Sequence, residues 1–185
     1  MEKHALLVID IQNDYFDGGN NPLTGSWNAS LNAKKILDLF RSNKKLVVYI
    51  QHVSTRPGST FFLPGTSGVE IHANVAPLAD EKVIRKHFPN SFRETELQEF
   101  LVQNEINSLV VCGMMTHMCI DATTRAAKDL GYNCTLVTDA CATKELLFGG
   151  KTVKADEVHT SFLAALNGFY ANVITTADIQ KMSSH

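Results

Sequence analysis

Three side chains in the sequence have the chemistry needed to cleave a small carbonyl compound: Asp10, Lys86 and Cys119. Asp10 directly follows the apolar run 5–9, and Lys86 and Cys119 come shortly after the apolar stretches 83–84 and 108–112. A thiolate attacks carbonyl carbon, a carboxylate can carry protons, and a nearby ammonium group favours the thiolate. Together they would suffice for nucleophilic acyl transfer, provided that the fold brings them to one place.

Cys119 also lies near the start of a helix that we expect over residues 117–130. A helix N-terminus offers free backbone N–H groups and a positive dipole end, so it lowers a thiol pKa and can bind an oxyanion. We therefore expect a lowered pKa for Cys119. Taken singly, each residue has a plainer interpretation: Asp10 capping a turn, Lys86 as a solvated charge and Cys119 as core. Only their coincidence at one edge of a sheet favours catalysis.

Short apolar runs predict the elements that would position these residues. Such runs are typical of strands buried on both faces, and helical segments alternate with them along the chain. This alternation predicts a single α/β domain over residues 1–185, a three-layer sandwich with a mostly parallel six-stranded sheet between helices. Ligands bind beyond the carboxyl ends of such strands, which is where the three residues would lie. The expected strands cover residues 5–9, 46–50, 83–84, 108–112, 134–138 and 171–174.

The composition excludes several classes of partner. The chain has 185 residues, with 17 Lys and Arg against 19 Asp and Glu, a net charge of −2. Because nucleic acids and anionic membranes attract basic surfaces, we expect neither as a partner. We also expect no membrane span, since no apolar run reaches the required ~18–20 residues. No signal peptide is visible and the four cysteines form no CxxC pair, so we expect a cytoplasmic protein with free thiols.

Three motifs resemble those of one enzyme family in the same order along the chain. Residues 7–16 resemble the opening motif of the isochorismatase-like cysteine hydrolases, residues 86–92 their lysine motif and residues 111–119 their nucleophile motif. The resemblance covers about residues 5–176. This family includes nicotinamidases, N-carbamoylsarcosine amidases, streptothricin hydrolases and isochorismatases, and it has a six-stranded parallel sheet.

The resemblance implies that Asp10, Lys86 and Cys119 form a catalytic triad. It also implies a cis peptide bond between Met114 and Met115, with the N–H groups of Met115 and Cys119 forming an oxyanion hole. It implies a small-molecule substrate and an assembly of two or four identical chains, a homodimer or homotetramer. Substrate contacts are expected from five further residues, for which ordinary roles in turns or in the core are the alternative: Asn13, Phe16, His52, Phe92 and Thr116.

The sequence departs from the metal-binding members of this family. Nicotinamidases bind a metal through an Asp-x-His motif after the second strand, and here Ile50 takes the place of that Asp. His52 remains, but residues 61–64 supply no second histidine, and a first-row metal needs three or four ligands. We therefore expect no metal and no other cofactor.

Cys119 favours cleavage of a C–N bond in an amide, ureide or carbamoyl compound, because isochorismatases that cleave a vinyl ether typically lack the cysteine. Three alternatives stay open. The protein could hydrolyse a vinyl ether with Asp10 and no covalent step. It could bind a small molecule without catalysis, since a fold does not fix a function. Cys119 could also serve as a redox-sensing thiol.

Residues 54–68 predict a long loop, and long loops in compact domains are often functional. The loop carries Phe61 and Phe62, large apolar side chains that need burial. We expect them to lie in a lid, in the core or against another subunit.

Overall fold

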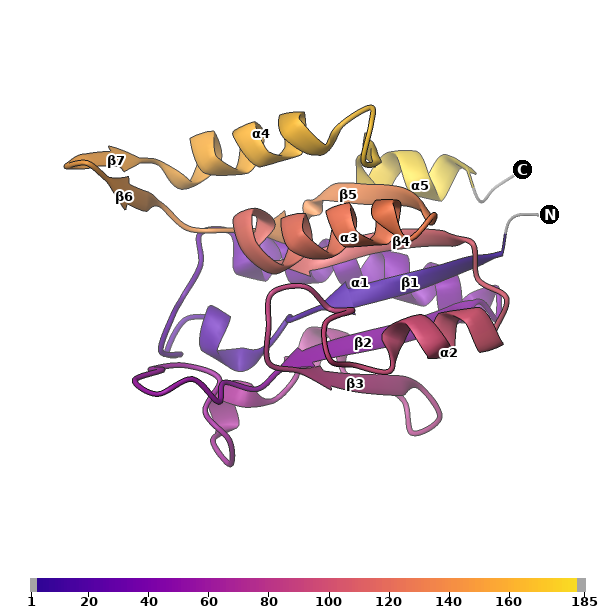
Figure 1. The fold of residues 1–185 in the computed structure, drawn as a ribbon, viewed down its shortest axis with the longest axis horizontal. Helices are drawn as coiled ribbons and strands as arrows, with labels where there is room; N and C mark the ends of the chain where they lie inside the picture. The colour runs from indigo at the N-terminus through magenta and orange to yellow at the C-terminus, as the bar shows by residue number, and fades with distance from the viewer. Residues whose placement is uncertain (1–2, 183–185) are drawn as a thin grey trace.

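The computed structural model describes residues 3–182, which form one sheet of six parallel strands with helices on both faces (Figure 1). The order of strands across the sheet is β3-β2-β1-β4-β5-β8, and every neighbouring pair is parallel. This confirms the predicted fold class. The strands are β1 (His4–Ile9), β2 (Leu46–His52), β3 (Lys82–Lys86), β4 (Ser108–Met114), β5 (Asn133–Ala142) and β8 (Asn172–Ile174).

In the part of the chain that the structure describes, five α-helices cover the sheet. The helices α1 (Ser26–Ser42) and α5 (Thr176–Met182) pack on one face. The other face is covered by α2 (Leu97–Gln103), α3 (Asp121–Asp129) and α4 (Ala155–Leu166). Within residues 3–182, none of the helices has the length and apolar character needed to cross a membrane.

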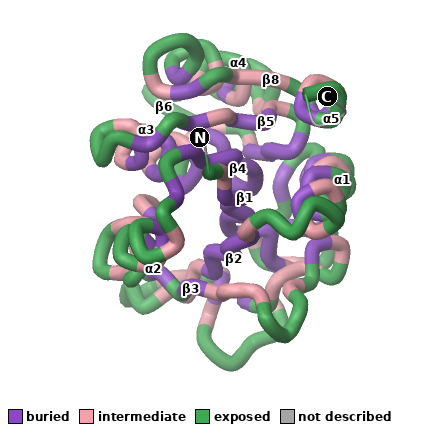
Figure 2. Tube along the Cα trace, turned by 90° about the vertical axis from the view of Figure 1, so that its right-hand side faces the viewer, coloured by how far each residue is buried: buried purple, intermediate pink, exposed green. Residues whose placement is uncertain are grey.

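The strand β1 lies near the middle of the sheet, and this position explains why its sequence is apolar without interruption. Leu6 and Val8 belong to the core beneath α1, whereas Leu7 and Ile9 belong to the core beneath α2, α3 and α4. Successive side chains of a strand point to opposite faces, so a strand covered on both faces must be apolar at every position. The tube in Figure 2 accordingly shows β1, β2 and β4 buried between more exposed helices.

Gly113, near the end of β4, allows the close approach of β4 to β1. Its φ is +132°, and a Cβ atom at this position would lie 1.9 Å from the carbonyl oxygen of Ile9. The register between β4 and β5 also shifts between Val111 and Gly113. A side chain at position 113 would therefore push β1 and β4 apart directly beside Asp10.

We expect Gly113→Ala to lower the free energy of unfolding by at least about 3 kcal/mol, because backbone rather than a flexible side chain blocks the added methyl group. Gly131→Ala is the matched control, since Gly131 also has a positive φ but no atom within 4 Å of its Cβ position. That control should lose only about 1 kcal/mol. Urea unfolding measures both, and equal losses would contradict the steric explanation.

Two regions differ from the expected elements. The helix expected over residues 117–130 consists of a π-helical turn, Thr116–Ile120, followed by α3. A hairpin that the apolar pattern did not predict, β6 (Leu146–Phe148) and β7 (Lys151–Val153), projects beyond the end of the sheet (Figure 1). Its Phe148 is 87 % exposed. An assembly of identical chains would cover such a side chain, and the homodimer or homotetramer stays a prediction.

The loop at residues 54–68 buries one of its two aromatic residues in the core. Phe62 is buried beside Tyr15, with ring centroids 4.6 Å apart, whereas Phe61 is only partly buried. Asp14 fixes the loop, because its buried carboxylate accepts hydrogen bonds from the N–H groups of Phe62 (2.6 Å) and Asn20 (3.0 Å). The loop is thus tied to the short segment that follows Asp10.

Candidate active site

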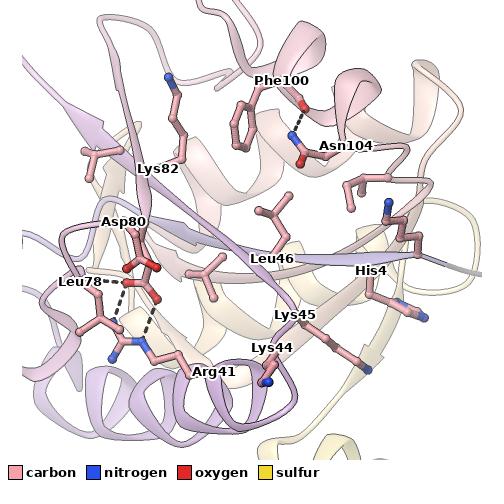
Figure 3. Close-up of a pocket in the computed structure, with 15 residues that line it drawn as sticks. His4, Arg41, Lys44, Lys45, Leu46, Leu78, Asp80, Lys82, Phe100 and Asn104 are labelled. Carbon is pink, nitrogen blue, oxygen red and sulfur yellow. Dashed lines mark hydrogen bonds and ion pairs between the residues drawn. The ribbon is translucent and has the colours of Figure 1, made fainter.

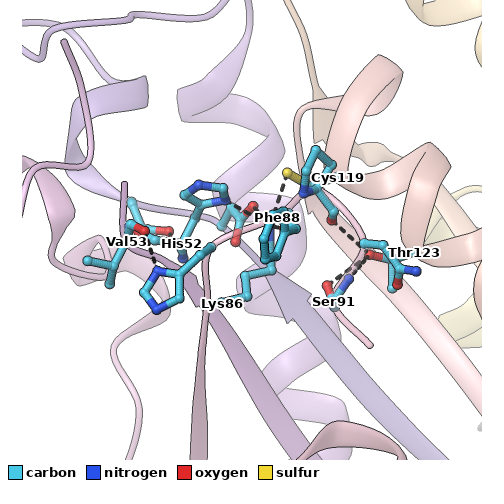
Figure 4. Close-up of polar contacts among 12 residues, drawn as sticks. His52, Val53, Lys86, Phe88, Ser91, Cys119 and Thr123 are labelled. Atoms are coloured by element: carbon cyan, nitrogen blue, oxygen red, sulfur yellow. Dashed lines mark hydrogen bonds and ion pairs between the residues drawn. The ribbon is translucent and has the colours of Figure 1, made fainter. Parts of the chain in front are cut away.

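The structure brings Asp10, Lys86 and Cys119 together at the carboxyl edge of the sheet. Figure 4 shows Lys86 and Cys119 there, with His52 and Phe88 nearby. Lys86 Nζ lies 2.7 Å from Asp10 Oδ2 and 3.1 Å from Cys119 Sγ. Asp10 and Lys86 are fully buried, and Cys119 is 5 % exposed. The ammonium group of Lys86 therefore lies between a carboxylate and a thiol, out of contact with bulk solvent.

Strand order explains why three residues so far apart in the chain meet. Asp10 follows β1, Lys86 ends β3, and Cys119 lies in the π-helical turn after β4. Since β3, β2, β1 and β4 are consecutive and parallel, their carboxyl ends share one edge. Asp10 has φ +51°, a left-handed conformation that aspartate adopts more readily than most residues, and its N–H donates to Ile50 O.

His52 and a backbone carbonyl complete the surroundings of the ammonium group. Lys86 Nζ lies 3.1 Å from His52 Nδ1 and donates to the carbonyl oxygen of Phe88 at 3.1 Å. The amide of Gln12 holds His52 in place, because it accepts from the His52 N–H (2.8 Å) and donates to the His52 carbonyl (2.9 Å). His52, at the end of β2, therefore lies beside Lys86, and its predicted contact with substrate stays a prediction.

The protonation of Cys119 differs from the expectation. Burial raises the pKa of the thiol well above its usual value, the Asp10 carboxylate raises it further, and the Lys86 ammonium only partly opposes them. The expected lowered pKa was therefore wrong, because helix and lysine effects are outweighed by desolvation. Burial alone would lower the pKa of Lys86, but the Asp10 carboxylate and Cys119 outweigh it and the pKa is raised. The resting site holds a thiol and an ammonium group.

His52 is neutral at physiological pH. Burial lowers its pKa to about 4, Lys86 and His87 lower it as well, and the Asp10 carboxylate opposes them. A neutral imidazole has one nitrogen free to accept a hydrogen bond. With the proton on Nε2, His52 Nδ1 can accept from the Lys86 ammonium group.

The buried neutral His52 predicts a loss of stability in acid. Below about pH 6.5 the unfolded chain protonates this histidine while the folded chain does not, so stability present above pH 6.5 is lost progressively towards pH 4. The loss from His52 should reach roughly 2–3 kcal/mol. We expect His52→Gln to show a smaller loss between pH 6.5 and 4 in urea unfolding. Identical pH profiles for the two proteins would contradict this assignment.

Three of the residues predicted to bind substrate have contacts outside the triad. The Asn13 amide donates to the carbonyl oxygen of Ser67. Phe16 stacks on His72 with ring centroids 3.7 Å apart, and Phe92 stacks on Tyr132 at 6.0 Å. These contacts fit roles in loop and core packing, and substrate binding by the three residues stays a prediction.

Thr116 and Met115 lie in or next to the π-helical turn that carries Cys119. Thr116 is buried, with its hydroxyl oxygen 2.8 Å from His159 Nδ1 and 3.3 Å from the carbonyl oxygen of Ala142. The Met114–Met115 peptide bond is cis, at the position that the resemblance implies. The Met115 carbonyl accepts from the N–H groups of Met118 and Ile120, which closes the turn around Cys119.

Sequence reasoning missed two parts of the site. One is the carbonyl oxygen of Phe88, which no residue-type pattern reveals because every residue has one. The other is Tyr15, which is buried close enough that burial first, and then the charges of Cys119 and Asp10, raise its pKa. The sequence signal for Tyr15 was its place in the segment that follows the first strand.

A groove of about 910 Å³ lies at the opposite, amino edge of the sheet (Figure 3). Its lining includes Arg41 and Lys82, which form ion pairs with Glu81 (2.7 Å) and Glu96 (2.8 Å) respectively. None of the predicted site residues lines this groove. The reactive groups Asp10, Lys86 and Cys119 are instead buried against one another at the carboxyl edge.

Comparisons with known proteins agree with this geometry. The family model of the isochorismatase domain matches residues 4–178. The chain is 53 % identical over 172 residues to the uncharacterized isochorismatase family protein YddQ of Bacillus subtilis (strain 168), covering 93 % of this chain and 96 % of the relative. It is 34 % identical over 149 residues to a streptothricin hydrolase of Streptomyces noursei, covering 77 % of this chain and 55 % of that protein.

A solved structure of an isochorismatase hydrolase from Oleispira antarctica superposes with a TM-score of 0.92. It is 48 % identical in sequence, and the match covers 96 % of each chain. The chain therefore belongs to the isochorismatase family of hydrolases.

Proposed function

We propose that the protein hydrolyses a C–N bond of a small amide, ureide or carbamoyl compound through a thioester on Cys119. The observation that carries this proposal is the position of Lys86 Nζ, 2.7 Å from the Asp10 carboxylate and 3.1 Å from the Cys119 thiol. A binding protein would have no need of this buried set of charges. The match to a streptothricin hydrolase and the family resemblance support hydrolysis as the reaction class.

In the first step, Asp10 takes the proton of Cys119 while Sγ bonds to the carbonyl carbon of the substrate. The π electrons of the carbonyl move to its oxygen, which the N–H groups of Met115 and Cys119 hold. Because the pKa of the thiol is raised, the proton leaves sulfur only as Asp10 receives it. The Lys86 ammonium stabilises the negative charge on whichever of the two groups carries it.

In the second step the C–N bond breaks, and Asp10 gives its proton to the departing nitrogen. This leaves a thioester on Cys119. Water then loses a proton to Asp10 and attacks the thioester carbon, and the C–S bond breaks. The proton on Asp10 returns to sulfur, so the site regains its starting state and the net reaction consumes one water.

Trapping the intermediate tests this proposal. The protein is mixed with a panel of small amides, ureides and carbamoyl compounds, quenched in acid and analysed by peptide mass spectrometry. We expect an acyl adduct on Cys119 with each compound that is turned over, and hydroxylamine should divert the same intermediate to a hydroxamate. Cys119→Ala gives the blank. Turnover of a panel compound with neither adduct nor hydroxamate would contradict the thioester.

A further inference from the structure

Three side chains at the carboxyl edge offer metal ligands of different chemistry around one point. They are the carboxylate of Asp10, the imidazole of His52 and the thiol of Cys119, and one ligand atom from each lies within 4.8 Å of the other two. Zn²⁺ takes oxygen, nitrogen and sulfur ligands at about 2.0–2.3 Å. Ligands of one tetrahedral ion therefore lie roughly 3–4 Å apart, so a small contraction would suffice.

The ammonium group of Lys86 occupies the place that such an ion would take. Lys86 Nζ is 2.7 Å from Asp10 Oδ2, 3.1 Å from His52 Nδ1 and 3.1 Å from Cys119 Sγ. It thus contacts one potential ligand from each of the three residues. Because Lys86 is fully buried, its positive charge is balanced only while the ammonium group stays beside the Asp10 carboxylate.

We propose that Asp10, His52 and Cys119 form a latent site for a thiophilic divalent cation such as Zn²⁺ or Cd²⁺, and that Lys86 excludes the metal from it. A divalent ion placed among these three side chains would be repelled by the buried ammonium group of Lys86. The ion and the ammonium group would also compete for the same three ligands. Lys86 therefore keeps the nucleophile from capture by thiophilic metals. This site differs from an Asp-x-His metal motif, because Ile50 stands where that Asp would be.

The inference rests on the geometry of the four side chains and does not depend on the proposed reaction. Metal binding converts the Cys119 thiol to a metal-bound thiolate, and the displaced proton goes to solvent. The charge-transfer absorption of a Cd²⁺–thiolate bond reports this step directly, whether or not a substrate is known.

Titration with Cd²⁺ compares the wild-type protein with Lys86→Met, which removes the charge and keeps an unbranched side chain that is one atom shorter. We expect Lys86→Met to bind one Cd²⁺ per chain with the thiolate absorption band, at least about 100-fold more tightly than the wild-type protein. Lys86→Gln serves as a second neutral variant, and far-ultraviolet circular dichroism checks that each variant is folded.

Two double variants assign the ligands. Adding Cys119→Ser to Lys86→Met should abolish the band, which excludes the other buried thiols Cys112, Cys134 and Cys141 as its source. Adding His52→Ala should weaken Cd²⁺ binding by at least about tenfold.

Several results would overturn the inference. Folded Lys86→Met and Lys86→Gln proteins without a Cys119-dependent band would show that the three groups do not form a site. Binding of Cd²⁺ by the wild-type protein with a thiolate band that Cys119→Ser abolishes can be measured whether or not the Lys86 variants fold, and it would show that Lys86 does not exclude the metal. A band that survives Cys119→Ser would place the metal on another cysteine.

Discussion

Replacing Cys119 by alanine is expected to lower turnover of a C–N substrate by at least about 10⁴-fold, because the variant lacks the atom that forms the covalent intermediate. The change removes a single sulfur atom from a buried turn, so the fold should persist. The rate is measured as release of the amine or ammonia. Cys134→Ala is the matched control: Cys134 is also buried, its Sγ lies near the Tyr132 carbonyl and away from the triad, and its loss should leave turnover unchanged.

The same variant separates the remaining alternatives. Full turnover of a C–N substrate by Cys119→Ala would exclude the thioester mechanism. Release of pyruvate from isochorismate, undiminished in Cys119→Ala, would select the vinyl ether reaction with Asp10 as the acid. Tight binding of a panel compound without turnover in the wild-type protein would favour a silent binding protein.

Replacing Asp10 by asparagine is expected to change turnover and thiol reactivity in opposite directions. Turnover should fall by roughly 10³-fold or more, because asparagine cannot accept the proton of Cys119. Alkylation of Cys119 by iodoacetamide should become faster at a given pH, because the Asp10 carboxylate raises the pKa of the thiol and its removal lets that pKa fall. The wild-type thiol should react slowly at neutral pH, since its pKa lies above the usual value.

Alkylation rates across pH, resolved for Cys119 by mass spectrometry, measure this effect. Lys86→Met is a control with the opposite expected effect on the thiol. The Lys86 ammonium lowers the pKa of Cys119, so its loss should slow alkylation below the wild-type rate. If Asp10→Asn slowed both turnover and alkylation, Asp10 would act by maintaining the structure of the site and not as its base.

The positions of the triad could be predicted from the sequence because they depend on little more than the parallel arrangement of strands. Short apolar runs located β1, β3 and β4, and the carboxyl ends of neighbouring parallel strands must share one edge. Asp10, Lys86 and Cys119 follow three such runs, so they approach one another once the strands are adjacent. His52 was found by the same reasoning.

The pKa of Cys119 could not be predicted in this way. Lysine proximity and a helix start can be inferred from spacing, but the degree of burial depends on how the loops close over the site. Burial proved the largest influence on this thiol. The roles of Phe16 and Phe92 as substrate contacts came from family resemblance alone, and their packing depends on loop paths that no local pattern specifies.

The β6–β7 hairpin had a local signal that was overlooked. Gly149 and Gly150 both have positive φ, as the two central residues of a tight hairpin turn require, and a short apolar run, Leu146–Phe148, precedes them. The flanking segments are only three residues each, so periodicity alone carried little information.

The surroundings of Lys86 have one further consequence. An ammonium group has three N–H bonds, yet four acceptors lie within 3.1 Å of Lys86 Nζ, on Asp10, Cys119, His52 and Phe88. One acceptor is therefore always left over. In the proposed reaction a proton passes from sulfur to the carboxylate, and the better acceptor then changes from Asp10 to Cys119. Rotation of the ammonium group about the Cε–Nζ bond is enough to reassign the hydrogen bonds. Lys86 can therefore stabilise the negative charge on either group while the rest of its side chain stays in place.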